Sequence, residues 1–177
     1  MAAGIEEFDI GVLMGASWHM SRKFIHQDTP VTIEQMIDVF NWEIEKKPLF
    51  YIAADGSSQE VAAFSLIRKD TGHVLVDSVG KKFVAESNLK LVEIIKDGVL
   101  KAYPDLICEG AFTIFNNRTA VIQLKAKEFQ VKGDKSPSFT RMCFANPIGM
   151  GAYKALVHNE RVVCANTLRV AESEGRA

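Results

Sequence analysis

The densest group of chemically distinct side chains in this 177-residue sequence is the run from Arg161 to Leu168, which combines a cation, a thiol and an amide. Cys164 would become a nucleophile only if a histidine or another base came close enough to take its proton. Only folding could bring one of the four histidines there, and the two valines before the cysteine are typical of a buried, unreactive thiol. We therefore predict that this run anchors the chain in the core and leaves Arg161 free to meet a partner.

A second candidate, Asp70-Thr71-Gly72, has the letters of an aspartic-protease active site. That chemistry needs two carboxylates that share one proton, and hence two such loops or a homodimer. The sequence holds one copy, and Arg68-Lys69 precedes it where the protease pattern has apolar residues. We predict that these three residues form a hairpin turn.

The other common catalytic and cofactor patterns are absent from the sequence. No two histidines stand four residues apart, as a zinc protease requires, and the three cysteines include no C-x-x-C pair. There is no P-loop and no dinucleotide-binding fingerprint, because Gly149-Met150-Gly151 is too short to cradle a phosphate. We predict a protein that is not an enzyme and that has no catalytic residue, no metal site and no cofactor.

The basic residues are more suggestive of function. Lys125 and Lys127 alternate along one expected strand, Arg141 lies on another, and two further lysines follow a third. Such a stripe can contact the phosphates of single-stranded DNA while aromatic rings stack on its bases. The alternative is a solvated sheet face, which we favour when these residues are taken alone. The candidate contacts are Lys81, Lys82, Lys125, Lys127, Arg141 and Arg161, with Phe83 and Phe139 as candidate stacking residues.

The composition is that of a soluble globular protein, with 47% hydrophobic and 24% charged residues. The length suits a single domain over residues 1–177. A net charge of −1 argues against a dedicated, highly basic nucleic-acid binder. No apolar run approaches the roughly 18 residues of a membrane span, and the acidic start is unlike a secretion signal. We therefore expect a cytoplasmic protein without a membrane partner.

Two amphipathic helices are expected. Thr32 and Gln35 have the spacing of a capping box, and apolar residues at helical spacing follow them. Ser87 can cap a second helix over residues 88–103, in which Gly98 is unfavourable relative to alanine by about 1 kcal/mol.

Alternating apolar and polar residues between turn residues predict antiparallel strands. The first group comprises residues 42–53, 61–69 and 74–79, and the second comprises residues 107–115, 119–131, 139–145 and 152–158. Residues 1–30 are expected to be an irregular lead segment, and residues 172–177 are expected to fray. The predicted fold class is α+β, an antiparallel β-meander sheet with helices packed on one face, in the order β-β-β-α followed by further strands.

Four motifs stand in the order Trp18-His19, Trp42 to Tyr51, Arg68 to Gly72, and Arg161 to Leu168. In this order they resemble the phage- and plasmid-like proteins of domain-of-unknown-function family 932, in which the last motif reads R-V-V-C-x-N-T-L. The chain departs from the family at Met20-Ser21-Arg22, where the family has a glycine-rich sequence. It also ends nine residues after Leu168, sooner than the resemblance implies, and we expect either a shortened relative or a fragment.

The resemblance implies a setting in bacterial mobile genetic elements, but no established activity. More weakly, the expected order of elements is similar to the core of the single-strand annealing superfamily of phage recombination. We therefore expect a non-enzymatic protein encoded by a phage, prophage or plasmid, which binds or anneals single-stranded DNA as a homo-oligomer in the host cytoplasm. The alternative is a protein-binding inhibitor of a host defence system, of the anti-restriction or anti-CRISPR type.

Overall fold

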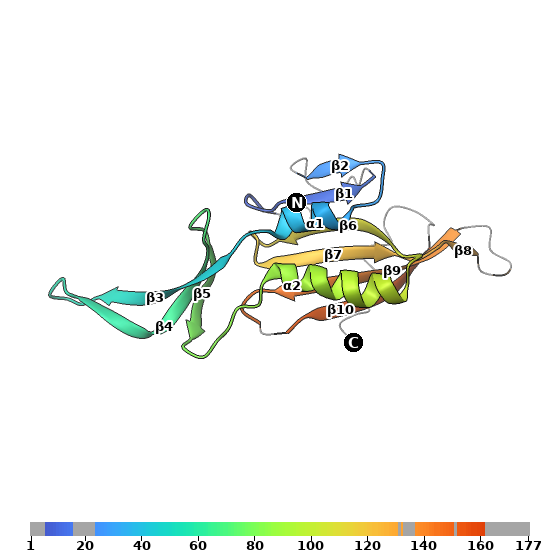
Figure 1. Cartoon of the computed structure of the whole chain (residues 1–177). Coiled ribbons are helices and arrows are strands. Elements are labelled where there is room, and N and C mark those ends of the chain that lie inside the picture. Colours follow the sequence, from blue (N-terminus) through green and yellow to red (C-terminus); the bar gives the residue numbers. More distant parts are fainter. Residues whose placement is uncertain (1–5, 16–23, 131, 133–136, 151, 162–177) are drawn as a thin grey trace.

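The computed structural model describes residues 6–15, 24–130, 132, 137–150 and 152–161, which form two sheets and two helical segments (Figure 1). The helices are α1 (Ile33–Phe40) and α2 (Asn88–Glu93), and α2 continues into a π-helix, Ile94–Leu100. The strands are β1 (Gly11–Met14), β2 (Ile25–Gln27), β3 (Ile44–Ile52), β4 (Ser58–Arg68), β5 (Val74–Gly80), β6 (Ile107–Ile114), β7 (Thr119–Lys125), β8 (Phe129–Gln130), β9 (Pro137–Pro147) and β10 (Lys154–Arg161).

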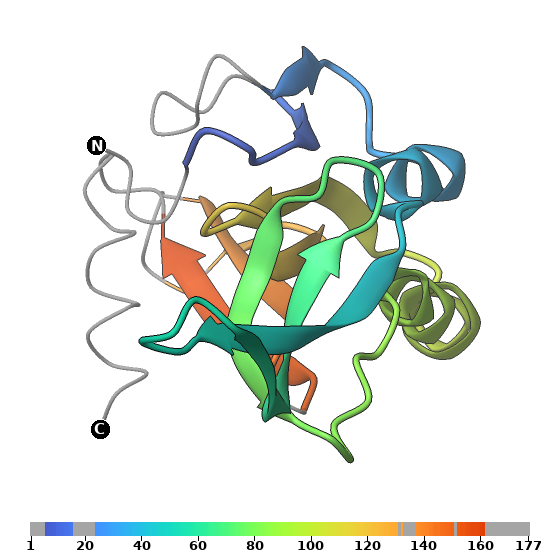
Figure 2. The same ribbon diagram turned by 90° about the vertical axis from the view of Figure 1, so that its left-hand side faces the viewer.

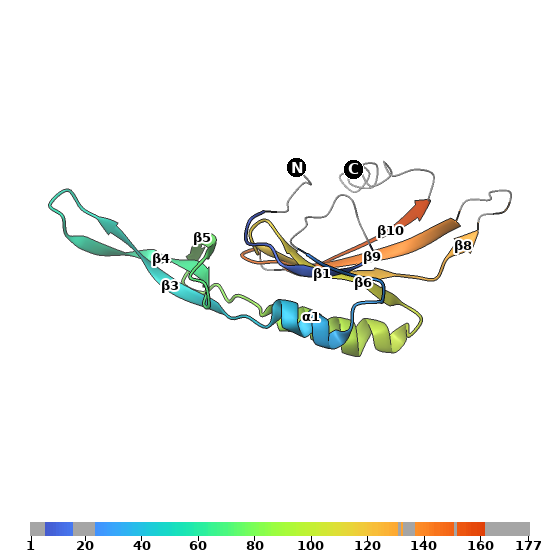
Figure 3. The ribbon, with the colours of Figure 1, turned by 90° about the horizontal axis from the view of Figure 1, so that it is seen from above.

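The larger sheet has the strand order β10-β9-β7-β6-β1-β2, and the short β8 pairs with β9 outside this path. Its neighbours are antiparallel except for β1 and β2, which run parallel. Both helices lie on one face of this sheet (Figure 3). The buried cluster between the two layers includes Met36, Phe40, Leu91, Ile95, Ala111, Ile122 and Leu124. Because burial of each large side chain in this cluster, such as Phe40 or Leu91, contributes about 1.5–3 kcal/mol, the cluster makes the larger sheet a fixed platform.

The smaller sheet is antiparallel, has the order β3-β4-β5, and projects from one end of the platform (Figure 1). Seen along the projection, its strands lie in front of the larger sheet and cross it (Figure 2). The register of β3 on β4 shifts between Pro48 and Leu49, as expected for a proline that cannot donate to the ladder. Beyond this shift the hairpin of β3 and β4 extends furthest from the body (Figure 3).

The expected combination of helices and strands is observed, but the strands form two sheets rather than one, and the larger sheet contains a parallel pair. The lead segment also differs from the prediction, because residues 11–14 and 25–27 are strands rather than irregular chain. Strands of three or four residues give almost no periodic signal in a sequence. In addition, β1 pairs with β6, about a hundred residues away, and β2 joins the sheet only through β1. Gly11 is required there, since a Cβ atom would lie 2.3 Å from the Cβ of Phe112.

The two helix starts follow the prediction. The hydroxyl of Thr32 accepts a hydrogen bond from the Gln35 backbone at 3.3 Å, and the Gln35 side chain accepts from the Thr32 backbone at 2.9 Å. The hydroxyl of Ser87 likewise accepts from the Leu89 backbone. No helix within the described residues is long and apolar enough to cross a membrane.

We predict that Thr32→Ala lowers the free energy of unfolding by about 0.5–2 kcal/mol, because it removes a cap from a helix that supplies part of the core. Urea denaturation monitored by circular dichroism measures the change. Thr29→Ala, at an exposed position three residues earlier, is the matched control and should leave the free energy of unfolding within about 0.5 kcal/mol of the parent value. Equal losses in both variants would contradict the role of the cap.

Candidate functional site

The smaller sheet is joined to the platform through Trp42, which lies between α1 and β3. Its indole is 7% exposed and packs in a cluster with Leu66, Leu75 and Ile148. The indole nitrogen donates to the carbonyl of Val39 at the end of α1, at 3.1 Å. Since Ile148 follows β9 while Leu66 and Leu75 belong to β4 and β5, this cluster holds the two sheets together.

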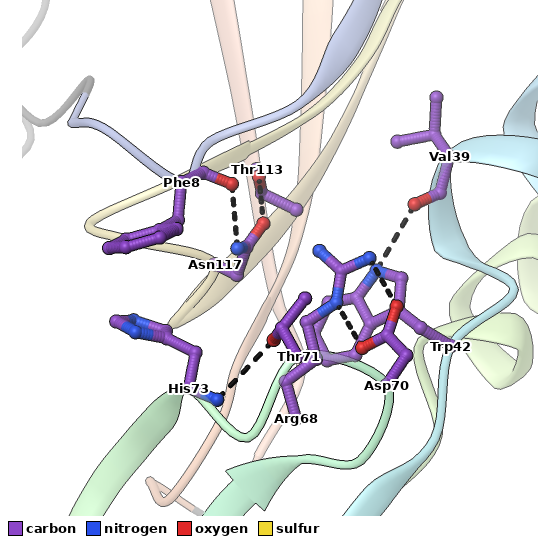
Figure 4. A network of polar contacts seen from close by, with 9 residues as sticks. All are labelled: Phe8, Val39, Trp42, Arg68, Asp70, Thr71, His73, Thr113 and Asn117. Carbon is purple, nitrogen blue, oxygen red and sulfur yellow. Dashed lines mark hydrogen bonds and ion pairs between the residues drawn. The ribbon is translucent and has the colours of Figure 1, made fainter.

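The guanidinium of Arg68 covers the outer face of this joint (Figure 4). It lies 4.7 Å from the centre of the Trp42 ring and donates to both carboxylate oxygens of Asp70, at 2.8 and 2.9 Å. The hydrogen bond from Arg68 is the main reason why the pKa of the Asp70 carboxyl is lowered. Asp70, Thr71 and Gly72 lie in the turn between β4 and β5, as the sequence predicts.

A second set of contacts ties the β5 end of the turn to the platform (Figure 4). The ring of His73 stacks on Phe8, with ring centres 4.4 Å apart. The amide of Asn117 donates to the carbonyl of Phe8 and accepts from the hydroxyl of Thr113, while its backbone donates to the buried carboxylate of Asp9 at 2.7 Å. These bonds hold the turn between β6 and β7 against the segment that leads into β1.

That turn has an unusual backbone, because Phe115, Asn116 and Asn117 all have positive φ angles, of 58°, 54° and 63°. Asparagine tolerates this left-handed conformation, but phenylalanine adopts it at a cost of about 1–2 kcal/mol. The contacts of Asn117 with residues 8 and 9 stabilise the turn. The side chain of Phe115 in this turn is 47% exposed.

The most exposed apolar surface of the described chain lies on the distal part of the β3–β4 hairpin, residues 49–63, which we call the arm. Ile52 is 78% exposed, Phe50 56% and Tyr51 51%, and Val61 on the opposite strand is also exposed. The third strand, β5, pairs with β4 only from Ala63 to Ile67. The arm is therefore a ribbon of two strands that extends beyond the sheet (Figure 3).

A two-stranded ribbon with no further strand or helix packed on it is at best marginally stable in water. Solvent-exposed side chains as large as Phe50 and Ile52 contribute little to the fold, and adjacent large apolar side chains on a surface mark an interaction site. The only charged residues of the arm are Asp55 and Glu60. The arm is thus apolar and weakly acidic.

A cleft of about 640 Å³ lies at the root of the arm, between the smaller sheet and the platform. Its residues come from β5, from the turn between β6 and β7, and from the segment between β9 and β10. Two cations line it, Arg118 and Lys154, and both are exposed with no ion pair through their side chains to any residue that the structure describes. Phe115 lies beside them, and two carboxylates, Glu6 and Asp77, also line the cleft.

The predicted basic stripe is partly neutralised. The Arg141 guanidinium donates to both oxygens of Glu109, at 2.6 and 3.2 Å, and the Lys125 ammonium lies 3.6 Å from the same carboxylate. Both cations also lie over the ring of Phe139, at 5.3 and 3.9 Å from its centre. Lys127 is exposed but lies beyond the end of β7. The structure therefore brings Lys125 and Arg141 together around a carboxylate and a buried ring.

Lys81 and Lys82 belong to a different part of the surface. They are exposed in the connection from β5 to α2, which the side chain of Asn146 ties to the platform through the carbonyl of Glu86. Asn146 pairs with Ala120 near the start of β7. Because a strand rises about 3.3 Å per residue, Lys125 lies roughly 17 Å further along β7 than Ala120. The two groups of lysines consequently do not form one continuous stripe.

Other predicted positions lie outside the described residues, or only their backbone is described. Arg161 ends β10, and the family-like run that follows it, with Cys164, lies outside the described residues, as do Trp18-His19 and the tail 172–177. Burial raises the pKa of the Cys108 thiol to about 12 and also raises that of Cys143, so neither is a thiolate at neutral pH. No cluster of three or more potential metal ligands occurs among the described residues.

Comparisons with known proteins give no match for this chain among protein families, curated proteins or solved structures.

Sequence reasoning did not identify the arm or the cleft as functional regions. The run Phe50-Tyr51-Ile52 reads as an ordinary strand, and its exposure on both sides depends on where β5 stops pairing. Arg118 follows two asparagines in a predicted turn, which gives no hint that Lys154 faces the same cleft. The one feature of the sequence that pointed to this turn was the pair of adjacent asparagines, Asn116 and Asn117, which favour a left-handed conformation.

We predict that Asp70→Asn lowers the free energy of unfolding at pH 7 by up to about 1 kcal/mol, because the pair with Arg68 is half-exposed on the carboxylate side. The folded-state pKa of Asp70 is lowered, so this contribution is present above the unfolded-state pKa of about 3.9 and is lost as pH falls through the folded-state value. Urea denaturation of the parent and of Asp70→Asn from pH 7 to pH 2.5 should show that the difference between their free energies of unfolding falls towards zero. In an Arg68→Gln background, Asp70→Asn should have no such pH-dependent effect, and an unchanged effect there would refute this assignment.

Proposed function

We propose that this chain is a non-enzymatic protein-binding module that engages its partner through the arm. The single observation that carries the proposal is the set of large apolar side chains on a ribbon that projects from the body, led by Ile52 and Phe50. Such residues are costly to keep in water, and burying Ile52 or Phe50 on a partner contributes about 1.5–3 kcal/mol per side chain. The joint at Trp42 supports the proposal, because it fixes the base of the arm and lowers the entropic cost of binding.

The chemistry of the arm indicates what kind of partner it fits. Its apolar side chains suit a hydrophobic groove, and Asp55 and Glu60 suit basic residues at the rim of that groove. The carboxylate of Asp55 accepts hydrogen bonds from both the backbone and the hydroxyl of Ser57, which lower its pKa and keep it charged at neutral pH. The arm therefore presents an apolar ribbon with an acidic tip.

The resemblance to proteins of mobile genetic elements supplies the setting for this proposal. A phage- or plasmid-encoded module of this kind would act in the cytoplasm of a bacterial host, and a host defence protein with a basic, apolar groove is the partner class that fits best. Inhibition would follow from occupying that groove and would require no catalytic residue. The proposal thus corresponds to an anti-restriction or anti-CRISPR type of inhibitor.

Replacing the exposed apolar residues of the arm should abolish partner binding without unfolding the chain. We expect the triple variant Phe50→Thr, Ile52→Thr and Val61→Thr to weaken the affinity for the partner at least tenfold, because each buried anchor typically contributes 1–2 kcal/mol or more. Threonine retains the β-strand preference, so circular dichroism should be unchanged. A photo-crosslinking residue at position 51 identifies the partner from host lysate, and calorimetry with the purified partner measures the affinity.

Val84→Thr is the control, since Val84 is 74% exposed but lies outside the arm in the connection to α2. It should bind like the parent protein. Reversing the charge of Glu60, which lies in β4 opposite Phe50, should weaken binding more at low salt than at high salt, because the partner groove is expected to be basic. The variant for this test is Glu60→Lys. A folded triple variant that binds the crosslinked partner with parent affinity would rule out the arm as the binding surface.

A second candidate function, single-stranded DNA binding, is favoured by the cleft. Arg118 and Lys154 line it without a carboxylate partner among the described residues, and the exposed ring of Phe115 stands beside them. Two unpaired cations and an aromatic ring are the elements of a site that holds phosphates and stacks a base. This site replaces the predicted stripe as the centre of the hypothesis, with Lys81 and Lys82 as more distant contacts.

Fluorescence anisotropy with a labelled single-stranded oligonucleotide at 20 and 200 mM salt tests this second function. We expect Arg118→Gln with Lys154→Gln to weaken binding about tenfold or more and to reduce the dependence on salt, because each lost phosphate contact lowers the salt slope by about one. Lys101→Gln, an exposed cation at the end of the second helical segment, is the matched control. No binding by the parent protein at 20 mM salt would exclude the DNA hypothesis.

A further inference from the structure

Apart from the two-residue β8, which pairs with β9 alone, the described chain has four strands at sheet edges, β2 and β10 in the larger sheet and β3 and β5 in the smaller one. An edge strand exposes unpaired backbone N–H and C=O groups, and monomeric proteins usually protect such edges with proline, bulges, lysine, other charges or short length. β2 has three residues, β3 carries Pro48, a shift of register and two lysines, and β5 has Asp77 at its centre. These three edges are protected.

β10 has none of these protections along its centre. It is eight residues long, pairs with β9 over its whole length without a shift of register, and contains no proline. The five residues from Ala155 to Asn159 carry no acidic residue, lysine or arginine. Leu156 is 48% exposed and Val157 is 59% exposed, and because neighbouring side chains alternate, these two lie on opposite faces of the sheet. The structure describes no strand on the outer side of β10.

We propose that β10 pairs with β10 of a second copy of this chain, antiparallel and across a two-fold axis at Val157, so that the two larger sheets become one. An axis perpendicular to the sheet keeps each face on the same side in both copies. The helices of both copies then cover the same face of the joined sheet. The pairing would bury Leu156 and Val157 of both copies and would satisfy the open ladder of each edge.

The pattern of charges on β10 selects this register. With Val157 opposite Val157 of the partner copy, Lys154 stands opposite Glu160, and this pair occurs twice because of the symmetry. Directly opposite residues of an antiparallel pair lie on the same face, where opposite charges stabilise the pairing and like charges destabilise it. Centring the axis on His158 instead places Glu160 against Leu156, and centring it on Leu156 places Lys154 against His158. Of these three registers, only the one centred on Val157 places residues of opposite charge opposite each other at both ends of the paired segment.

The proposed dimer is independent of the arm, which lies in the other sheet, and so it goes beyond the proposed function. It would give each assembly two arms. A partner with two grooves, or a symmetric partner, would then be bound more tightly than by one arm if the geometry allows both arms to engage.

Charge reversal tests the register directly. We expect sedimentation equilibrium of the full chain to show a dimer. Lys154→Glu and Glu160→Lys should each raise the dissociation constant of the dimer about tenfold, because each reversal sets two pairs of like charges opposite each other. The double variant carrying both reversals should recover the parent dissociation constant, since it restores opposite charges in the same register. A general effect of charge or of misfolding would not be reversed in this way.

Three controls keep the outcome decisive. Val157→Lys should give a monomer with the circular dichroism of the parent, because two lysines would meet at the axis. The triple arm variant should remain dimeric, so that failure of the arm proposal and failure of the dimer are distinguishable. A monomeric parent protein at 100 μM, or a double variant no better than the single reversals, would overturn the proposal.

Discussion

Burial of Trp42 is the interaction on which the arrangement of the two sheets depends. One indole contacts the end of α1 through its nitrogen, β4 and β5 through its ring, and the segment after β9 through Ile148. Arg68 then closes its outer face and is itself held by Asp70. Because these contacts come from three separate stretches of chain, the arm can project into solvent with few contacts of its own and still point in one direction.

The same joint explains why the candidate surfaces lie where they do. The smaller sheet meets the platform only at its base, so a cleft remains beside the joint and the hairpin beyond it is free on both faces. The turn that carries Phe115 borders this cleft. Asn117 holds the turn in place through hydrogen bonds to Phe8 and Asp9, which lie more than a hundred residues earlier in the chain. Strain in the backbone at Phe115 is offset by this buried network, which includes the carboxylate of Asp9.

Electrostatics shape what the surface offers to a partner. Glu109 forms ion pairs with both Arg141 and Lys125, and the ring of Phe139 lies under both cations. The cations predicted to bind DNA on this face are therefore engaged in contacts within the chain. By contrast, Arg118 and Lys154 have no such partner among the described residues. An apolar arm is accordingly a better supported contact surface than a basic stripe.

Features that depend only on neighbouring residues could be predicted from the order of side chains. The capping box of Thr32 and Gln35, the cap at Ser87 and the turn at Asp70 to Gly72 are all formed within three residues, and their physical causes can be read from the order of side chains. The strands of the smaller sheet were also expected close to where they occur, because turn residues bound them. Three other features could not be predicted in this way: the division of the strands into two sheets, the contact of Glu109 with Arg141, and the exposure of Phe50 and Ile52. Each of these depends on packing between distant segments, and alternation along one strand cannot show whether either of its faces will be covered.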